Sequence, residues 1–277
     1  MKFQKLFVGY KNYSNMKAKI LLSLMKCIFF ILFTFPILIF AQSKINDNIL
    51  VARNTEEMRT DTLSKSQAVK SISPRFRVGV QTGYAYRTAP IPIDASSGMK
   101  NHLSKLRNNL SYGANISYFF KKGFGVLKSN IGIGMKYSGT YTNVLSEGIP
   151  YRVKDNSIIY SMLSEKFETH YIGAFFETRV FLGKNKHCVF GNMGVGYIRY
   201  NNDAKIAYED VKIIGNSAAF SAEIGYDFLI TKNFAIGLQT SFILGFVNYL
   251  VDNIKPKTPQ KENLSHLNIT LGFRFYK

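Results

Sequence analysis

Hydrophobic and polar residues alternate with a period of two through eight segments of this chain, all of them after Pro74. Because successive side chains of a β-strand point to opposite faces, this alternation predicts strands with one apolar and one polar face. The last segment shows it most clearly, where Phe273 and Phe275 flank Arg274. The predicted strands cover residues 76–88, 106–120, 125–142, 167–182, 188–200, 217–230, 234–246 and 267–275.

The connections between these strands alternate in length. Short turns are expected at residues 121–123, 183–187 and 231–233, and long polar loops at residues 89–105, 143–166, 201–216 and 247–266. Short periplasmic turns and longer extracellular loops are typical of outer-membrane barrels, and in lipid a sheet must close so that every backbone group is paired. We therefore predict an all-β fold, an eight-stranded antiparallel up-and-down transmembrane β-barrel with both termini in the periplasm.

Aromatic residues of the apolar faces gather near the strand ends. At the short-turn end they are Phe76, Tyr118, Phe120, Phe228, Phe234, Phe273 and Phe275, and at the long-loop end Tyr84, Tyr86, Tyr112, Tyr137, Tyr197, Phe220 and Phe242. Two such girdles are expected at the two membrane–water interfaces. The alternative is a soluble lipocalin-like barrel with its apolar faces inside, but an eight-stranded interior is too narrow for so many rings.

The N-terminal part has the pattern of an export signal. Lys17, Lys19 and Lys26 precede an apolar run at residues 27–40, which is followed by Ala41. A basic region before an apolar run of this length is typical of a signal peptide and is short for a membrane span. We expect cleavage near Ala41; the alternative is an uncleaved membrane anchor.

The patterns divide the chain into three parts. Residues 1–42 are the predicted signal peptide, with Met16 as an alternative start, and residues 43–73 form a polar, flexible periplasmic lead-in. Residues 74–277 are the predicted barrel.

Composition and charge narrow the classes of function. Hydrophobic residues make up 46% of the chain although the mean hydropathy is −0.04, which favours interleaved strands over a helical membrane bundle. The net charge of +19 suits anionic lipid, whereas Lys and Arg never occur in runs longer than two, so we expect no nucleic-acid partner. Cys27 would leave with the signal, and a lone Cys188 allows neither a disulfide within the chain nor a cysteine metal site.

Charged residues on the polar faces form the candidate site. Arg77, Glu177, Arg179, Asp227 and Arg274 are expected in the periplasmic half of the lumen, with Lys136 and Glu223 near its middle. A charge in a narrow lumen is costly unless it is paired, so these residues predict an ionic network that fills the barrel. Arg274 should lie near Arg77 across the closing seam and needs an acid, either Asp227 or Glu177. The alternative is a narrow ion pore.

The sequence contains little that indicates catalysis. His102, His170, His187 and His266 lack metal-ligand spacing, so we expect no metal and no cofactor. His170, with Ser161 or Ser164 and Glu168 nearby, is the candidate for the alternative of a lipid-modifying barrel enzyme. Polar residues near a loop are usually only solvated, and we expect no enzyme activity.

Several of these segments also resemble a known family. The alternating strands, Phe40-Ala41-Gln42, residues 231–244 and the closing Leu271-Gly272-Phe273-Arg274-Phe275 are similar to the outer-membrane β-barrel domain family of Bacteroidetes, which includes PorT-like proteins, over residues 74–277. The resemblance implies an OmpA- or OmpX-type barrel in a Gram-negative outer membrane, surrounded by lipid and inserted by machinery that recognises the last strand. It implies a structural or interaction component that acts through its extracellular loops or periplasmic rim, or alternatively a PorT-like component of protein secretion.

Overall fold

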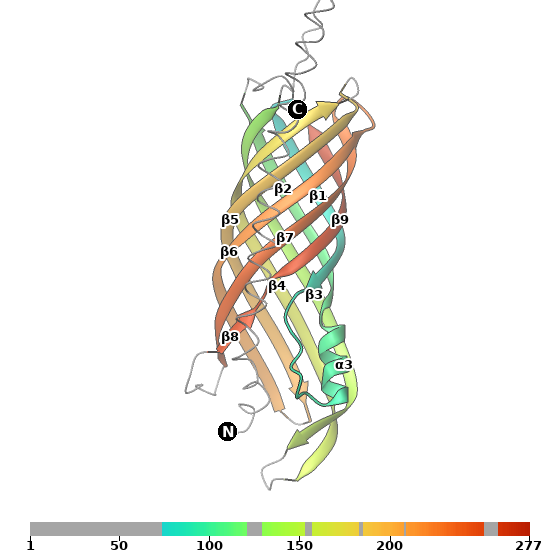
Figure 1. Cartoon of the computed structure of the whole chain (residues 1–277), viewed down its shortest axis with the longest axis vertical. Helices are drawn as coiled ribbons and strands as arrows, with labels where there is room; N and C mark the ends of the chain where they lie inside the picture. Colours follow the sequence, from blue (N-terminus) through green and yellow to red (C-terminus); the bar gives the residue numbers. More distant parts are fainter. Residues whose placement is uncertain (1–73, 121–128, 153–156, 183–184, 208, 252–259) are drawn as a thin grey trace, which may run out of the picture.

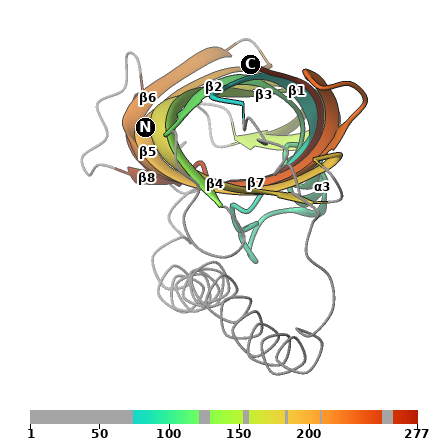
Figure 2. The same ribbon diagram turned by 90° about the horizontal axis from the view of Figure 1, so that it is seen from above.

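A computed structural model describes residues 74–120, 129–152, 157–182, 185–207, 209–251 and 260–277. These residues form a barrel whose ring is seen end-on in Figure 2. Its wall consists of β1 (Phe76–Arg87), β2 (Asn108–Phe119), β3 (Asn130–Arg152), β4 (Ile158–Leu182), β5 (His187–Ile206), β6 (Glu209–Leu229), β7 (Phe234–Val251) and β9 (His266–Tyr276).

Strand pairing closes the sheet completely. Each strand from β1 to β7 pairs antiparallel with the next, and β9 pairs with both β7 and β1. The short β8 (Gln260–Asn263) pairs with β7 next to the start of β9, where β7 continues toward the α3 end. The predicted all-β, eight-stranded antiparallel barrel is therefore confirmed. The predicted signal peptide and lead-in lie outside the described residues.

The two faces of the wall have opposite polarity. In β9 burial alternates at every residue, so that Phe273 is 63% exposed and its neighbour Arg274 only 1%. Outward positions of the wall carry large apolar side chains, and many inward positions carry polar or charged ones. This arrangement is the reverse of a water-soluble barrel and is what a lipid environment requires.

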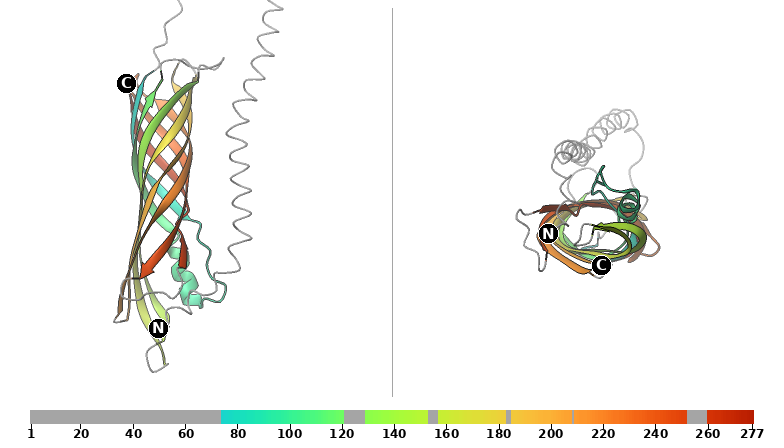
Figure 3. Two further views of the ribbon diagram at one scale, coloured as in Figure 1. Left: turned by 90° about the vertical axis from the view of Figure 1, so that its left-hand side faces the viewer. Right: turned by 90° about the horizontal axis from the view of Figure 1, so that it is seen from below.

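The wall is much taller on one side than on the other (Figures 1 and 3). The strands β1, β2 and β9 have 12, 12 and 11 residues, whereas β4 has 25. The long polar loops predicted at residues 143–166, 201–216 and 247–266 are therefore largely wrong. The strands β3 to β7 continue into these segments, and β8 occupies the last of them. The outward face of these extensions mixes apolar and charged side chains, so the alternation is lost although the hydrogen-bonded ladder continues.

The loop predicted at residues 89–105 contains a helix, α3 (Ser97–Lys105). Ser96 caps it by accepting a hydrogen bond from the Met99 amide at 3.3 Å. The helix packs against the extended part of β3, and Met99 contacts a small buried cluster around Ile149. No helix within the described ranges is long and apolar enough to cross a membrane.

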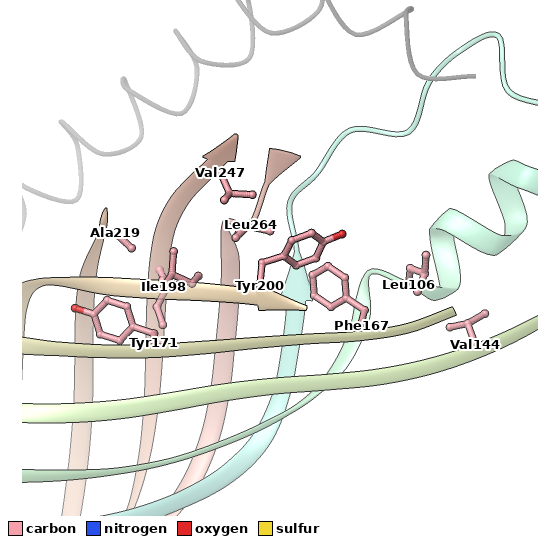
Figure 4. Packing of buried hydrophobic residues seen from close by; sticks show 10 residues of the cluster. Leu106, Val144, Phe167, Tyr171, Ile198, Tyr200, Ala219, Val247 and Leu264 are labelled. Carbon is pink, nitrogen blue, oxygen red and sulfur yellow. The ribbon is translucent and has the colours of Figure 1, made fainter. Parts of the chain in front are cut away.

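Apolar side chains fill the lumen at the end that carries α3 (Figure 4). This cluster contains Leu106, Val144, Phe167, Tyr171, Ile198, Tyr200, Ala219, Ile243, Val247 and Leu264. The inward charges predicted a lumen filled by polar groups. This prediction is wrong for the half of the lumen that carries the apolar cluster. Its charged half lies toward the opposite end, where the chain terminates.

Candidate functional site

The charged half of the lumen brings together the seven inward residues selected from the sequence. They come from β1, β3, β4, β6 and β9, and none is more than 4% exposed. The residues are Arg77, Lys136, Glu177, Arg179, Glu223, Asp227 and Arg274. Within this set, four residues form a continuous chain of ion pairs.

That chain, here called the ionic cluster, consists of Arg77, Glu177, Asp227 and Arg274. Arg77 Nη1 lies 2.9 Å from Glu177 Oε1 and 3.9 Å from Asp227 Oδ2. Arg274 Nη1 lies 3.0 Å from Asp227 Oδ1. The two arginines thus share Asp227, and both acids considered from the sequence take part. Because all four side chains are 0% exposed, each depends on its partners for the loss of hydration.

The register explains how two like charges fit side by side. Arg274 pairs with Gly79 and Arg77 with Tyr276, so the arginines lie diagonally across the β1–β9 seam. The guanidinium carbons of Arg77 and Arg274 lie 4.1 and 5.4 Å from the centre of the Phe190 ring. A shared aromatic face is a favourable surface for guanidinium groups.

Further polar groups complete the cluster, and sequence reasoning missed them. Tyr276 donates its hydroxyl hydrogen to Asp227, and Ser117 Oγ donates to Glu177 Oε2 at 2.7 Å. The predicted last strand ends at residue 275, one residue before Tyr276, although the position of Tyr276 beside the outward Phe275 already indicates an inward side chain. A Cβ at Gly237 would lie 1.9 Å from Asp227 Oδ1, so only glycine leaves room for this carboxylate.

A second ion pair lies apart from the cluster. Lys136 Nζ is 3.5 Å from Glu223 Oε2, and Asn192 Nδ2 donates to Glu223 Oε1 at 2.9 Å. Lys136 Nζ also lies 5.7 Å from the centre of the Tyr171 ring, which belongs to the apolar cluster. This pair therefore marks the boundary between the charged and apolar halves of the lumen.

Arg179 is the member of the predicted network that has no acidic group within ion-pair distance among the described residues. Its guanidinium carbon lies 3.3 Å from the centre of the Phe119 ring, and its Nη2 donates to the carbonyl oxygen of Pro74. Phe181 and Tyr276 contribute further rings at 5.1 and 5.5 Å. Arg179 therefore joins the start of the barrel to an aromatic layer rather than to the ion pairs.

At the other end of the barrel, His102 attaches α3 to the wall. Its Nδ1 lies 2.9 Å from Ser146 Oγ on β3, and its Nε2 lies 3.0 Å from Glu165 Oε2 on β4. Asn202 Nδ2 donates to the other oxygen of Glu165 at 2.6 Å. A serine, a histidine and an acid in contact suggest nucleophilic chemistry, but His102 is 0% and Ser146 8% exposed. The arrangement fits a structural clasp.

Substitution of His102 by Ala should loosen α3 while leaving the barrel intact. The change leaves Glu165 and Ser146 without their partner, and an unsatisfied buried polar group costs about 1–3 kcal/mol. We expect hydrogen exchange of the α3 amides to accelerate about tenfold or more, since 1.4 kcal/mol corresponds to a factor of ten. Lys100→Ala, on the exposed face of the same helix, is the matched control. Equal exchange in the two variants would contradict the clasp.

Of the candidate hydrolase group around His170, only the acid is near the ring: Glu168 Oε2 lies 4.0 Å from His170 Nε2, whereas Ser161 and Ser164 lie nine and six residues away along β4. His170 Nδ1 lies 2.7 Å from the Tyr137 hydroxyl, and Ser161 Oγ donates to the backbone oxygen of Met162. Nor does any group of three His, Cys, Asp or Glu side chains with metal-binding geometry occur in the part of the chain that the structure describes.

Near the α3 end, burial raises the pKa of the Glu262 carboxyl above its ordinary value, while its ion pair with Arg87 acts in the opposite direction.

The chain is similar in fold to several membrane proteins of known structure. Neisserial surface protein A matches 73% of this chain and 97% of its own at 11% identity and a TM-score of 0.43. The attachment invasion locus protein Ail of Yersinia pestis covers 73% and 99% at 11% identity with a TM-score of 0.41. The outer membrane protein OprG of Pseudomonas aeruginosa covers 74% and 97% at 11% identity with a TM-score of 0.40.

Sequence comparison adds no relatives to these structures. No family model matches the chain, and no curated protein matches it significantly. With identities near 11% and TM-scores below 0.5, the assignment of the architecture rests on the strand pairings themselves. The similarity of this chain to these proteins is therefore one of fold, that of a small closed barrel.

Proposed function

We propose that this protein is an integral outer-membrane β-barrel with a side-chain-filled lumen, which acts as a structural or interaction component. The observation that carries the proposal is the inverted polarity of a closed wall. Leu238, Leu271 and Phe273 are more than half exposed on its outside, while the charged residues of the ionic cluster are buried inside. In water so large an exposed apolar surface would cause aggregation, whereas a protein surrounded by lipid requires an apolar outer surface.

The filled lumen argues for a closed barrel rather than a narrow pore. The ionic cluster occupies one half, and the apolar cluster around Phe167 and Tyr171 occupies the other. Eight strands enclose only enough space for side chains. Reconstituted into planar lipid bilayers, the protein should show no stable conductance. Stable, large single-channel openings would contradict the closed lumen and favour the pore.

Recognition is proposed at the two ends of the barrel. In the proposed orientation both ends of the barrel sequence lie at the periplasmic rim, and the tall wall with α3 faces the cell exterior. The extracellular end offers the larger surface, since the extended sheet continues beyond the short strands by many residues. The proposal includes lipid and the barrel-insertion machinery as partners, the latter through β9, and no enzyme activity. Chemical crosslinking in intact cells would identify protein partners and test the alternative of a PorT-like secretion role.

Membrane integration can be tested directly. The full chain should remain in the membrane fraction after carbonate and high-salt washes, and its electrophoretic mobility should change on heating, as expected when a closed barrel unfolds. Release by either wash would refute integration. A soluble barrel would also fold, so the wash distinguishes the two architectures where mobility alone does not.

A further inference from the structure

The outer surface of β4 and β5 changes from apolar to charged at one level. On β4 the outward residues Ile172, Ala174 and Phe176 are exposed and apolar. The next outward residues toward the α3 end are His170, Glu168 and Lys166, and on β5 the change falls between Tyr197 and Arg199. His170 and Arg199 lie directly opposite each other in the β4–β5 register. This row therefore marks the membrane–water interface on this side of the barrel.

Arg199, on the outward face of β5, has a positive charge that no neighbouring carboxylate neutralises. The two nearest outward acids are already occupied, because Glu168 lies 2.9 Å from Lys166 and Asp203 lies 3.7 Å from Lys212. Within the described ranges no carboxylate lies within ion-pair distance of the exposed Arg199.

The imidazole across from Arg199 is held in place. The Tyr137 hydroxyl forms a hydrogen bond with His170 Nδ1 at 2.7 Å, and the two rings stack with their centroids 6.1 Å apart. His170 Nε2 lies 4.0 Å from Glu168 Oε2, beyond hydrogen-bond distance, so this nitrogen remains available to a ligand. An exposed guanidinium opposite an oriented imidazole is a suitable arrangement for a phosphate group.

An apolar groove of about 720 Å³ lies on the same outer wall. Ala174 forms its floor between Met135 and Val195, which are its direct cross-strand neighbours. The larger rings of Phe176 and Phe220 also line it. Ala174 is four residues from His170 along β4, about 13 Å at ~3.3 Å per residue, which lies within the ~15 Å hydrocarbon depth of one leaflet.

We propose that this wall binds an anionic, phosphate-bearing lipid of the leaflet at the α3 end, with its phosphate at Arg199 and His170 and one acyl chain in the groove over Ala174. The inference rests on the proposed function, because only an inserted barrel meets this leaflet, and in the proposed orientation it is the outer one. The positive charge of Arg199 favours a lipid with a negatively charged headgroup, and the apolar groove over Ala174 favours contact with an acyl chain.

The test uses the full chain in nanodiscs of phosphatidylcholine, with diphosphoryl lipid A as the probe and bound lipid measured by native mass spectrometry. Arg199→Gln should weaken binding about fivefold, as expected for one basic residue at a lipid surface. Lys205→Gln is the charge control, since Lys205 is 71% exposed and paired with Asp210. Ala174→Trp should fill the groove and weaken binding, while Leu238→Trp on the outward face of β7 should not.

Each outcome decides the proposal. Equal binding by Arg199→Gln and Lys205→Gln, or by the two tryptophan variants, would overturn it. So would equal binding of lipid A with its phosphates removed. If phosphatidylglycerol binds as tightly and depends equally on Arg199, the ligand is an ordinary phospholipid and the assignment to an outer-leaflet lipid fails. Loss of heat-dependent mobility or of wash resistance in the wild-type chain would instead refute the proposed function itself.

Discussion

Substitution of Asp227 by Asn should lower the free energy of unfolding by about 3–5 kcal/mol, the usual cost of breaking a buried ion pair by removing one partner. Asp227 lies 3.0 Å from Arg274 and 3.9 Å from Arg77, and it accepts a hydrogen bond from Tyr276. Asn keeps the shape but not the charge, so Arg274 would lose its acidic partner and Arg77 would keep only Glu177. Because the chain has no tryptophan, urea unfolding of the barrel in lipid vesicles is best followed by circular dichroism.

The control for this experiment is an acid of the same type at the surface. Asp203 pairs with Lys212 at 3.7 Å, and their side chains are 41% and 53% exposed. Asp203→Asn should therefore change stability by no more than about 1 kcal/mol. A double-mutant cycle of Asp227→Asn with Arg274→Gln should be strongly non-additive, because the second change removes one of the charges stranded by the first. Similar stability of D227N and D203N would show that the ionic cluster does not hold the barrel together.

A charge introduced on the outer face of the barrel should lower the free energy of unfolding nearly as much as the loss of Asp227. Leu271 is 55% exposed in the middle of β9, with Thr82 and Leu238 as its neighbours on β1 and β7. Arginine on the lipid face near the bilayer midplane costs about 2–4 kcal/mol. We expect Leu271→Arg to lose this amount in urea unfolding from vesicles and to reach the membrane in lower yield.

The location of the lipid decides which outward positions tolerate arginine. Tyr160 is 76% exposed, but it lies on the tall part of β4, ten residues beyond the His170 level. Tyr160→Arg should therefore stay within about 0.5 kcal/mol of the wild type, as surface changes normally do. A tolerated Leu271→Arg, or an equal penalty at Tyr160, would contradict membrane insertion at the proposed depth.

The membrane-embedded part of the fold could be predicted from the sequence because lipid imposes a strict rule on it. Phe273 must face outward, so Arg274 must face inward, and the same parity holds along each strand. Beyond the lipid this rule ends. On the tall part of β4 the outward side chains include Tyr160, Met162 and Lys166, so apolar and charged residues share one face and no period remains. The strand extensions, α3 and β8 were missed for this reason.

For the candidate site, the alternation of inward and outward residues identified which charged side chains face the lumen, but not which of them form ion pairs. The contact between Arg77 and Glu177 joins β1 to β4 across the lumen, and it depends on how far the strands are staggered around the ring. Alternation within one strand carries no information about this stagger. The clasp of His102 to Glu165 was hidden for a related reason, since it joins a helix without strong amphipathic pattern to a strand extension that was not expected.

The ionic cluster draws its members from strands at the start, middle and end of the chain. Arg77 belongs to β1, Glu177 to β4, Asp227 to β6 and Arg274 to β9. Until β9 joins β7 to β1, Asp227 lacks both Arg274 and Tyr276, and the ring remains open. The pairing of β1 with β9 is also the contact of longest sequence separation in the wall, which is intrinsically slow to form. The ionic cluster is therefore complete only after β9 has closed the ring, so its energy stabilises the closed barrel and no earlier, open arrangement of the strands.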